Sequence, residues 1–422
     1  MKKYCVLPLL ICLIFSCNSQ EVVDNQYAKK NINSKSIKLI NGHWFNGEAF
    51  ENKTVWLKNG LINFENNEDE VDTIIDLLGN YVIPPFADAH NHNLESKHEL
   101  EKRIESYLNN GVFYVKLLST IKRRMAPIMH NYNKPTGIDI TMAHAPLTGK
   151  DGHPLGVRKR YLDYGYYSGM FNSMEEIEYH GYTLINTVED LENKWSKILS
   201  FSPDFIKLNL LYSEEYEKRK NDTLYFGKKG LNPALVSEIV KKAKASNLRV
   251  SAHVETAYDF HIAVTAGVNE IAHLPEISNG KPIDLKDITL AREKGIVIVT
   301  TVSLVLKRQE NPSYEDLVDN ITSNLKLFKQ EGVTIAVGSD QYNGNSVGEF
   351  NFLYELNVFS NLELLKMWTT NATKTIFPNR KIGVLKEGYE ASFLVLSKNP
   401  LVDISNINES ITLRVKQGVI LE

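Results

Sequence analysis

Strand-like apolar runs alternate with amphipathic helical runs through the middle of this 422-residue chain. Strands separated by helices predict a parallel sheet built from right-handed crossover connections. Eight such units predict an α/β fold of the (β/α)8 type, the TIM barrel. The strand candidates are residues 81–87, 112–118, 137–143, 205–210, 249–253, 269–273, 296–302 and 334–338.

The helix predicted at residues 233–246 is typical of the connections. Asn232 stands at its N-cap, Pro233 occupies the first helical position, and its last turn is basic. The longest connection, residues 148–193, is rich in Tyr and Gly and exceeds an ordinary loop. A segment of this length in a barrel is more often an active-site insertion than a plain connector.

Short strand-like runs also occur at both ends of the chain. Residues 36–40, 53–57 and 61–64 are separated by Asn41-Gly42 and Asn59-Gly60, which are turn signals, and residues 385–396 and 412–421 have Gly388 and Gly418 at turns. We infer a small β-sandwich domain to which both ends contribute. The predicted domains are residues 37–84 (first part of the small domain), 85–370 (barrel) and 371–422 (the part completing the small domain).

The first 17 residues resemble a secretory signal. Met1 to Lys3 are basic and residues 5–15 are almost wholly apolar, a run too short to span a bilayer. Leu13 to Cys17 resembles a bacterial lipobox, which predicts a lipoprotein signal peptide over 1–17, lipidation of Cys17 and a flexible linker over 18–36. The expected location is the bacterial envelope, on the periplasmic side or the outer-membrane surface. An ordinary cleaved signal is the alternative.

Charge and cysteine content limit the partners. The net charge of −3 provides no excess of cations to bind a nucleic-acid backbone. All three cysteines lie in the leader, so the exported protein has no disulfide. The expected partners are a small-molecule substrate and, through the lipid anchor, a membrane, while a homo-oligomer is left open. No cluster of arginines in the sequence indicates a strongly acidic substrate.

Five candidate metal ligands end the predicted strands. His90 and His92 lie two residues apart, so both project to one side of the first strand. His253, His273 and Asp340 lie at or just beyond the ends of the fifth, sixth and eighth strands. Catalytic residues of barrel enzymes gather at these carboxyl ends. Imidazole and carboxylate ligands suit zinc and neighbouring divalent ions.

Lys207 lies inside the apolar fourth strand. Such a lysine is commonly paired with a carboxylate or extends its amine to solvent. A desolvated lysine, however, loses its charge readily. A neutral amine at the centre of a barrel can react with carbon dioxide to form a carbamate, which is a carboxylate in effect.

These six residues, in this order, resemble the binuclear metal site of the amidohydrolase superfamily. Residues 75–90 resemble its entry into the barrel, and residues 370–377, 382–388 and 399–403 resemble its exit, although Pro85 and Ser392 depart from the usual pattern. The resemblance implies two divalent ions, with zinc expected, and a bridging carbamate on Lys207. His90, His92 and Asp340 would bind one ion, and His253 and His273 the other. A hydroxide shared by the ions would cleave an amide, peptide-like or cyclic amide C–N bond, with Asp340 as general base and acid.

His153, in the glycine-rich segment 149–154, resembles a segment of imidazolonepropionase-like and prolidase-like members and is a candidate substrate contact. His144 and Tyr212 are weaker candidates, since turn or packing roles suit them equally. A mononuclear deaminase is the closest alternative, but deaminases of this superfamily generally lack the lysine and place a glutamate three residues past the fifth-strand histidine. Here Glu255 follows His253 by two residues. A non-catalytic surface-binding lipoprotein is the second alternative.

Overall fold

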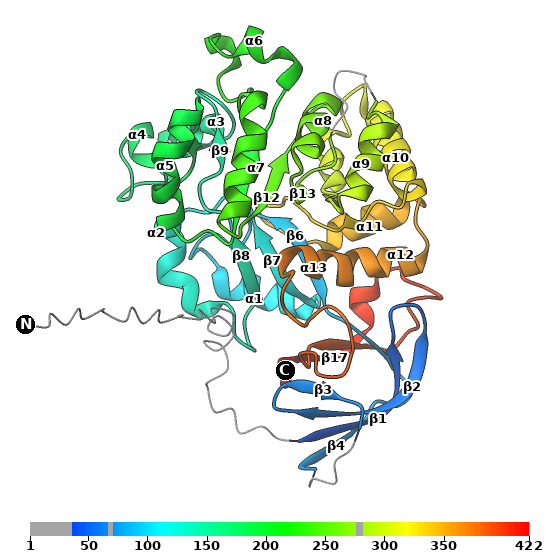
Figure 1. Cartoon of the computed structure of the whole chain (residues 1–422). Helices are drawn as coiled ribbons and strands as arrows, with labels where there is room; N and C mark the ends of the chain where they lie inside the picture. Colours follow the sequence, from blue (N-terminus) through cyan, green and yellow to red (C-terminus); the bar gives the residue numbers. More distant parts are fainter. Residues whose placement is uncertain (1–35, 66–70, 276–281, 422) are drawn as a thin grey trace, which may run out of the picture.

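The computed structural model describes residues 36–65, 71–275 and 282–421. The predicted signal peptide, Cys17 and nearly all of the predicted linker lie outside these residues. Parallel strands with helices around them form the larger part of the molecule, and a mixed sheet lies below them (Figure 1). None of the described helices has the length and apolar character needed to cross a membrane.

Both ends of the chain contribute strands to the same part of the molecule, and these strands form one mixed sheet. Its strand order is β18-β17-β16-β5-β1-β2-β3, with β4 also paired to β1. The strands are β1 (Ile37–Phe45), β2 (Phe50–Lys58), β3 (Leu61–Asn63), β4 (Thr73–Asp76), β5 (Tyr81–Ile83), β16 (Phe393–Leu396), β17 (Ile411–Lys416) and β18 (Val419–Leu421).

One predicted turn of this sheet is wrong. Asn41-Gly42 lies inside β1, at a bulge where the register with β2 shifts between Leu39 and Gly42. Asn41 adopts a positive φ of 57°, which a bulge accommodates as well as a turn does. The prediction of a turn at Asn59-Gly60 is confirmed, because the pair connects β2 to β3 with φ values of 55° and 74°.

The larger part contains two parallel sheets. One has the order β6-β7-β8 and the other β10-β9-β11-β12-β13-β14-β15. The backbone N–H of Ala89 in β6 donates to Val337 O, just past β15 (3.0 Å), and that of Asp204 donates to Met142 O in β8 (2.9 Å). The strands are β6 (Phe86–Asn91), β7 (Val112–Leu117), β8 (Asp139–Met142), β9 (Leu147–Thr148), β10 (Thr183–Leu184), β11 (Phe205–Asn209), β12 (Arg249–His253), β13 (Glu270–Ile271), β14 (Val297–Val299) and β15 (Ile335–Ala336).

The first predicted strand, residues 81–87, divides into two. β5 ends at Ile83 and joins the mixed sheet, whereas β6 begins at Phe86 and joins the parallel sheet. Pro84 and Pro85 separate them because proline has no N–H to donate to a strand ladder. The chain therefore passes from one sheet to the other at this point.

Helices follow most of the parallel strands. The predicted helix at 233–246 consists of a short 3₁₀ turn (Pro233–Leu235) and α7, and Asn232 caps it by accepting from Ala234 N (3.1 Å). The helices are α1 (Leu100–Asn109), α2 (Lys122–Met125), α3 (Leu155–Asp163), α4 (Met174–Ile177), α5 (Val188–Ser200), α6 (Tyr216–Arg219), α7 (Val236–Ala245), α8 (Ala257–Ala266), α9 (Leu285–Glu293), α10 (Tyr314–Gln330), α11 (Val347–Glu355), α12 (Asn361–Lys366) and α13 (Ala372–Ile376).

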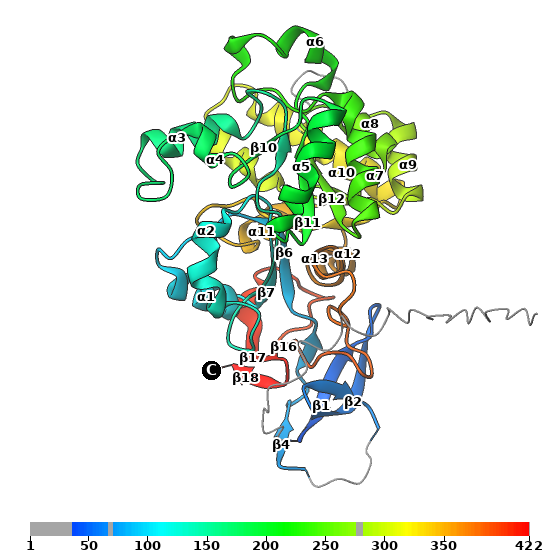
Figure 2. The same ribbon diagram turned by 60° about the vertical axis from the view of Figure 1, so that its left-hand side comes forward.

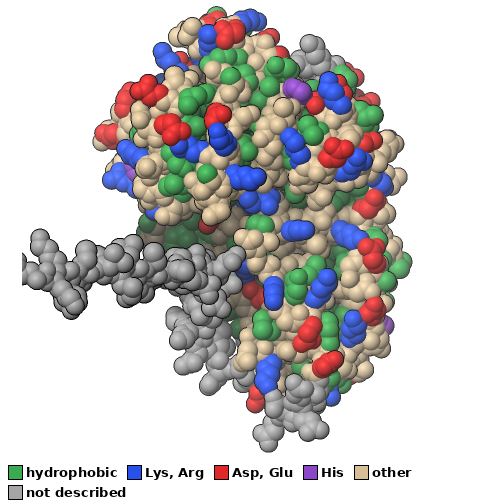
Figure 3. Space-filling view, viewed as in Figure 1, with side chains coloured by type: hydrophobic (Ala, Val, Ile, Leu, Met, Phe, Trp, Pro, Cys, Tyr) green, Lys and Arg blue, Asp and Glu red, His purple; other side chains and the backbone are tan. Residues whose placement is uncertain are grey.

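The long connection 148–193 folds into α3, α4, β10 and the start of α5. It encloses an apolar cluster of its own that includes Tyr167, Phe171 and Ile177. Figures 1 and 2 both place α3, α4 and α6 at the end of the molecule opposite the mixed sheet. On the face seen in Figure 3, basic and acidic side chains are interspersed, in keeping with the small net charge.

Candidate metal centre

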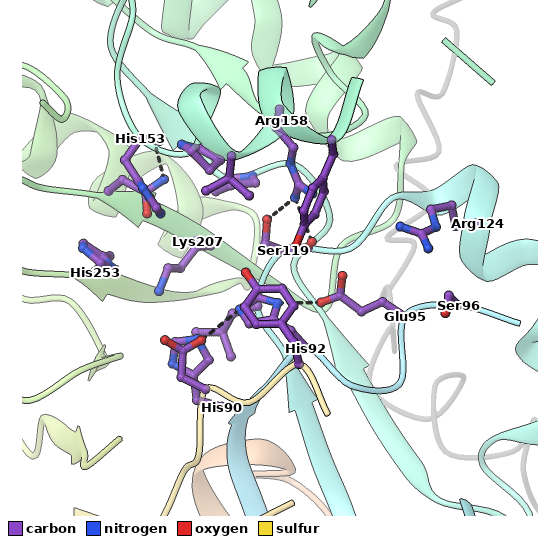
Figure 4. Close-up of a pocket in the computed structure, with 18 of the residues that line it drawn as sticks. His90, His92, Glu95, Ser96, Ser119, Arg124, His153, Arg158, Lys207 and His253 are labelled. Carbon is purple, nitrogen blue, oxygen red and sulfur yellow. Dashed lines mark hydrogen bonds and ion pairs between the residues drawn. The ribbon is translucent and has the colours of Figure 1, made fainter. Parts of the chain in front are cut away.

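A cavity of about 440 Å³ opens at the carboxyl ends of the parallel strands. Five of the six predicted ligands come from or follow strands β6, β11, β12 and β13, and Asp340 follows β15. All six line this cavity: His90, His92, Lys207, His253, His273 and Asp340. Figure 4 shows His90, His92, Lys207 and His253 pointing toward it. Side chains up to 250 residues apart in the sequence therefore meet at one place.

The tightest group consists of His90, His92 and Asp340. Asp340 Oδ1 lies 3.3 Å from His90 Nε2 and 3.2 Å from His92 Nε2. One ligand atom from each residue lies within 4.8 Å of the other two, so a single ion could contact all three. Asp340 has a φ of 50°, and its N–H donates to His90 O, which fixes its backbone beside β6.

His273 and His253 extend the group to the other side of the cavity. The His273 ring lies 4.4 Å from that of His90 and 4.6 Å from that of His253. His273 Nδ1 is 3.8 Å from Asp340 Oδ2. His253 also stacks on His153 at 5.1 Å. The four ligand histidines thus form one continuous row.

Three of these histidines have their Nδ1 atom in contact with a neighbouring oxygen atom. His90 Nδ1 contacts Ala272 O (2.8 Å), His92 Nδ1 contacts Glu95 Oε1 (2.7 Å), and His273 Nδ1 contacts Thr301 Oγ1 (3.0 Å). Partners of this kind fix the tautomer and the ring orientation of metal-binding histidines. The Nε2 atoms of His90 and His92 face Asp340 in the cavity.

Lys207 is 5% exposed, and its Nζ has no hydrogen-bond partner among the described residues. Burial lowers the pKa of Lys207 to about 7, although the carboxylates of Asp340 and Glu270 act in the opposite direction. His253 Nε2 also lacks a hydrogen bond, but Glu255 Oε2 lies 3.5 Å from it. Buried polar atoms are rarely left unsatisfied, so the Lys207 amine indicates a group that the protein is built to receive.

The pKa values of His90 and His92 are shifted in opposite directions. Burial lowers the pKa of His90 to about 3. Burial would do the same to His92, but Glu95 and Asp340 outweigh it and raise the pKa of His92 to about 9. Burial alone would raise the pKa of Asp340, but the His90 and His92 imidazoles hold it well below its usual range. Asp340 is therefore ionised at neutral pH and available as a ligand or a proton acceptor.

Asp88, two residues before His90, was not among the predicted site residues. Its carboxylate accepts hydrogen bonds from Ser339 N (2.9 Å), Ser339 Oγ (2.7 Å) and Asn91 Nδ2 (3.0 Å). These bonds connect β6 to the segment that carries Asp340. The available sequence signal was the period of two in a strand, which places Asp88 on the same side as His90.

The three predicted substrate contacts have different environments. His153 lines the cavity, and burial holds its pKa well below the usual range. His144 does not line the cavity; its Nδ1 contacts Thr120 Oγ1 (2.8 Å). Tyr212 is also outside the lining, and its ring packs under Arg219 at 3.7 Å. Of the three, only His153 is placed to contact a ligand in the cavity.

Several residues of the cavity were missed by the sequence interpretation. The insertion contributes Pro154, Val157, Arg158, Tyr161 and Tyr166, which agrees with its predicted place at the active site. The sequence shows no cluster of arginines, but the fold brings Arg103, Arg124 and Arg158 to one cavity. These arginines lie on different helices, so their sequence spacing carries no signal.

The fold and the site define an α/β protein with a histidine- and carboxylate-lined cavity at the ends of parallel strands, a setting suited to divalent metal ions. The model of the amidohydrolase family matches residues 202–421, a little over half of the chain. The chain therefore belongs to the amidohydrolase family.

A curated relative and solved structures agree with this assignment. Ochratoxinase from Aspergillus niger is 32% identical over 193 residues, which are 42% of this chain and 38% of that protein. The chain thus matches well under two thirds of this relative. The crystal structure of A. niger ochratoxinase matches with a TM-score of 0.72 and 22% identity, covering 92% of this chain and 95% of that one. A prolidase complexed with N-methylphosphonate-L-proline matches with a TM-score of 0.71 and 19% identity, covering 92% and 99%. At these identities the two structural matches show the fold alone.

Proposed function

We propose that this protein is a metal-dependent hydrolase that cleaves an amide, peptide-like or cyclic amide C–N bond. The observation that carries the proposal is the cavity in which His90, His92 and His273 surround Asp340 beside the unpaired Lys207. Family membership and the likeness to ochratoxinase and prolidase support a hydrolase acting on carbon–nitrogen bonds.

We also propose that the two parallel sheets close into a (β/α)8 barrel over residues 85–370. The hydrogen bonds from Ala89 to Val337 and from Asp204 to Met142 support this closure. Residues 37–84 and 371–422 would form the small β-sandwich, because β1 bends at its bulge and pairs along one edge with both β4 and β5. In such a barrel the cavity lies at the carboxyl ends of the strands, where catalytic residues gather.

The donor set fits two divalent ions, for which we propose zinc. His90, His92 and Asp340 would hold one ion and His253 and His273 the other, with Lys207 as a carbamate between them. Imidazole nitrogens and carboxylate oxygens are ligands that zinc accepts, and the lowered pKa of Lys207 favours the neutral amine that a carbamate requires. When bound, the ions would lower the pKa of water and polarise the scissile carbonyl.

Asp340 is the residue we assign to proton transfer. It is ionised and lies beside His90, His92 and His273, so it can accept a proton from the attacking water. The same carboxyl group can then donate this proton to the departing nitrogen. His153 stays neutral because burial lowers its pKa, so its ring can donate a hydrogen bond to the substrate carbonyl without adding charge.

Metal content provides the test. Purified protein is expected to contain close to two ions per chain by elemental analysis, and Lys207→Ala is expected to lose a large share of them together with amide hydrolysis. A short carboxylic acid added to Lys207→Ala is expected to restore part of the activity, since it can replace the carbamate. His98→Ala is the matched control, because His98 is largely exposed and outside the cavity. Two ions retained in active Lys207→Ala would refute the role of this lysine.

A one-metal deaminase is the second candidate, and one observation favours it. Among the described residues, only His90, His92 and Asp340 place three ligand atoms within 4.8 Å of one another. One ion per chain, unaffected by Lys207→Ala, with ammonia released from an aminated ring substrate, would support this candidate over the hydrolase. Absence of bound ions would instead support the non-catalytic binding lipoprotein.

For location we propose an exported lipoprotein that is attached to the bacterial envelope through Cys17. The support is the sequence of the leader alone: a basic start, an apolar run and a cysteine in a lipobox-like setting. Labelled palmitate is expected to be incorporated into the wild-type protein and not into Cys17→Ser. Equal labelling of both proteins, or of neither, would contradict the anchor.

A further inference from the structure

An amide side chain lines the cavity beside Lys207. Asn209 is the last residue of β11, two positions after Lys207, so both side chains project from the same side of the strand. Asn209 pairs in register with His253 of β12. It is 2% exposed and belongs to the lining of the cavity. A neutral polar group is thus fixed next to two of the predicted metal ligands.

The amide nitrogen of Asn209 is bound by the protein. Its Nδ2 donates to the backbone carbonyl of His153 (3.0 Å). A carbonyl oxygen can only accept a hydrogen bond, so the nitrogen of the amide, and not its oxygen, faces His153. The backbone of His153 is held in turn, because its N–H donates to Lys229 O (2.8 Å). These bonds fix the orientation of the Asn209 amide.

The amide oxygen of Asn209 has no such partner. Among the described residues, no N–H or O–H group donates to Asn209 Oδ1. This oxygen is also not one of the polar atoms that the protein encloses without a partner, as Lys207 Nζ is. Because Asn209 is otherwise buried and lines the cavity, its oxygen is reached from the cavity. It is an acceptor for an N–H or O–H group of a ligand.

His153 provides a donor next to this acceptor. The His153 ring stacks on the His253 ring at 5.1 Å, and Figure 4 shows both histidines and Lys207 in one part of the cavity. The proposed function assigns to this ring a hydrogen bond to the substrate carbonyl. An amide group presents the complementary pair, since its carbonyl accepts and its N–H donates. The donor of His153 and the acceptor of Asn209 therefore match the two polar groups of an amide.

The carboxylates of the cavity are occupied differently. Glu95 Oε1 contacts His92 Nδ1 at 2.7 Å, and Asp340 Oδ1 lies 3.3 Å from His90 Nε2 and 3.2 Å from His92 Nε2. Both acids thus contact predicted metal ligands. The Asn209 side chain forms no hydrogen bond with a predicted ligand among the described residues. Its oxygen is therefore available to a substrate when the ligands are occupied by metal ions.

We propose that Asn209 Oδ1 accepts a hydrogen bond from the N–H of the scissile amide, so that the enzyme selects secondary amides over tertiary amides. This inference rests on the proposed amide hydrolysis and names the part of the substrate that the same site recognises. The hydrogen stays on the nitrogen while water adds to the carbonyl and the C–N bond breaks, so the contact is present throughout the reaction. A tertiary amide has no N–H and leaves Asn209 Oδ1 unpaired, which costs free energy.

Two amides that differ by one methyl group test the selectivity: N-benzylbenzamide and N-benzyl-N-methylbenzamide. The ratio of their kcat/KM values, secondary to tertiary, is expected to fall about fivefold to thirtyfold from wild type to Asn209→Leu, the range for a lost buried hydrogen bond. Asn209→Leu also removes the bond to His153 O. That loss affects both amides and cancels in the ratio, so a purely structural role of Asn209 would leave the ratio unchanged.

Asn186→Leu is the matched control. Asn186 binds the same segment as Asn209 does, since its Oδ1 accepts from Lys150 N (2.8 Å), but it is exposed and outside the cavity lining. This variant is expected to keep the wild-type ratio. An unchanged ratio in Asn209→Leu, or an equal change in the two variants, would overturn the proposal.

Calorimetric binding of benzohydroxamate and N-methylbenzohydroxamate separates this inference from the proposed function. Both molecules bind zinc through two oxygens, and only the first carries an N–H. Its preference over the N-methyl compound, expressed as the ratio of Kd values, is expected to fall about fivefold to thirtyfold from zinc-loaded wild type to Asn209→Leu. If neither amide is hydrolysed but this fall is observed, the N–H contact stands and the proposed hydrolase fails. If the secondary amide is hydrolysed and the ratio of Kd values is unchanged, the hydrolase stands and the N–H contact fails.

Discussion

Two buried lysines on parallel strands have opposite environments. Lys116 in β7 is 2% exposed and Lys207 in β11 is 5% exposed, and burial lowers the pKa of both. Lys116 Nζ forms an ion pair with Glu270 Oε2 at 2.7 Å, whereas Lys207 Nζ has no hydrogen-bond partner among the described residues. The fold neutralises one buried amine and leaves its neighbour in the metal cavity unpaired.

The position of Glu270 bears on why Lys116 is paired and Lys207 is not. Lys207 is in register with Ser251, and Ser251 is in register with Glu270. Glu270 nevertheless binds Lys116, Ser251 and Thr375. A buried cation costs free energy unless it is paired, so a lysine left unpaired while the nearby carboxylate is bound to other side chains indicates a functional role.

A second paired group lies between the parallel strands and the mixed sheet. Asp139 in β8 binds Lys416 of β17 and Arg380, and Arg380 also binds Glu390 (2.7 Å). Lys416 and Asp139 are almost fully buried. These pairs join the parallel strands to the mixed sheet. The charged side chains that hold the fold together are thus paired, whereas Lys207 in the cavity is not.

The largest effect we predict is on Lys116→Met. Removing the amine leaves Glu270 buried without its ion partner, which is expected to lower the free energy of unfolding by about 3–5 kcal/mol. Urea denaturation followed by circular dichroism measures this value. A loss below about 1 kcal/mol would show that the Lys116–Glu270 pair is not needed for stability.

In metal-stripped protein, Lys207→Met is predicted not to lower the free energy of unfolding. The change replaces an unpaired buried amine with an apolar chain of similar length, so the free energy of unfolding is expected to stay equal or rise by about 1 kcal/mol. Amide hydrolysis by the metal-loaded variant is expected to be lost. A destabilisation as large as that of Lys116→Met would remove the contrast between the two lysines.

The smallest effect concerns acid pH. Burial would raise the pKa of Glu270, but Lys116 outweighs it and holds the pKa below its ordinary value of 4.5. A carboxylate whose pKa is lowered by folding stabilises the native state above its ordinary pKa, and this contribution is lost as the pH falls through the folded value. The unfolding free energy is therefore expected to fall below about pH 4.5, and less steeply in Glu270→Gln. Parallel curves for the two proteins would contradict this assignment.

Some of the predicted features depend only on residues that are neighbours in the chain. The His90-x-His92 pair, the cap at Asn232 and the turn at Asn59-Gly60 follow from the alternation of a strand, the chemistry of a cap and the φ values that Asn and Gly adopt. Asn41-Gly42 misled us because its environment is set by β2 on one side and by β4 and β5 on the other.

The sequence by itself determined the alternation of strands and helices, the order of six metal-ligand candidates and their place at strand ends, because periodicity and chain order are properties of neighbouring residues. Only the tertiary structure decided which amine is paired, that Asp88 joins Ser339, and that Arg103, Arg124 and Arg158 share one cavity. These relations join side chains that are far apart in the chain, and the distance between them is set by strand pairing and helix packing rather than by spacing along the sequence.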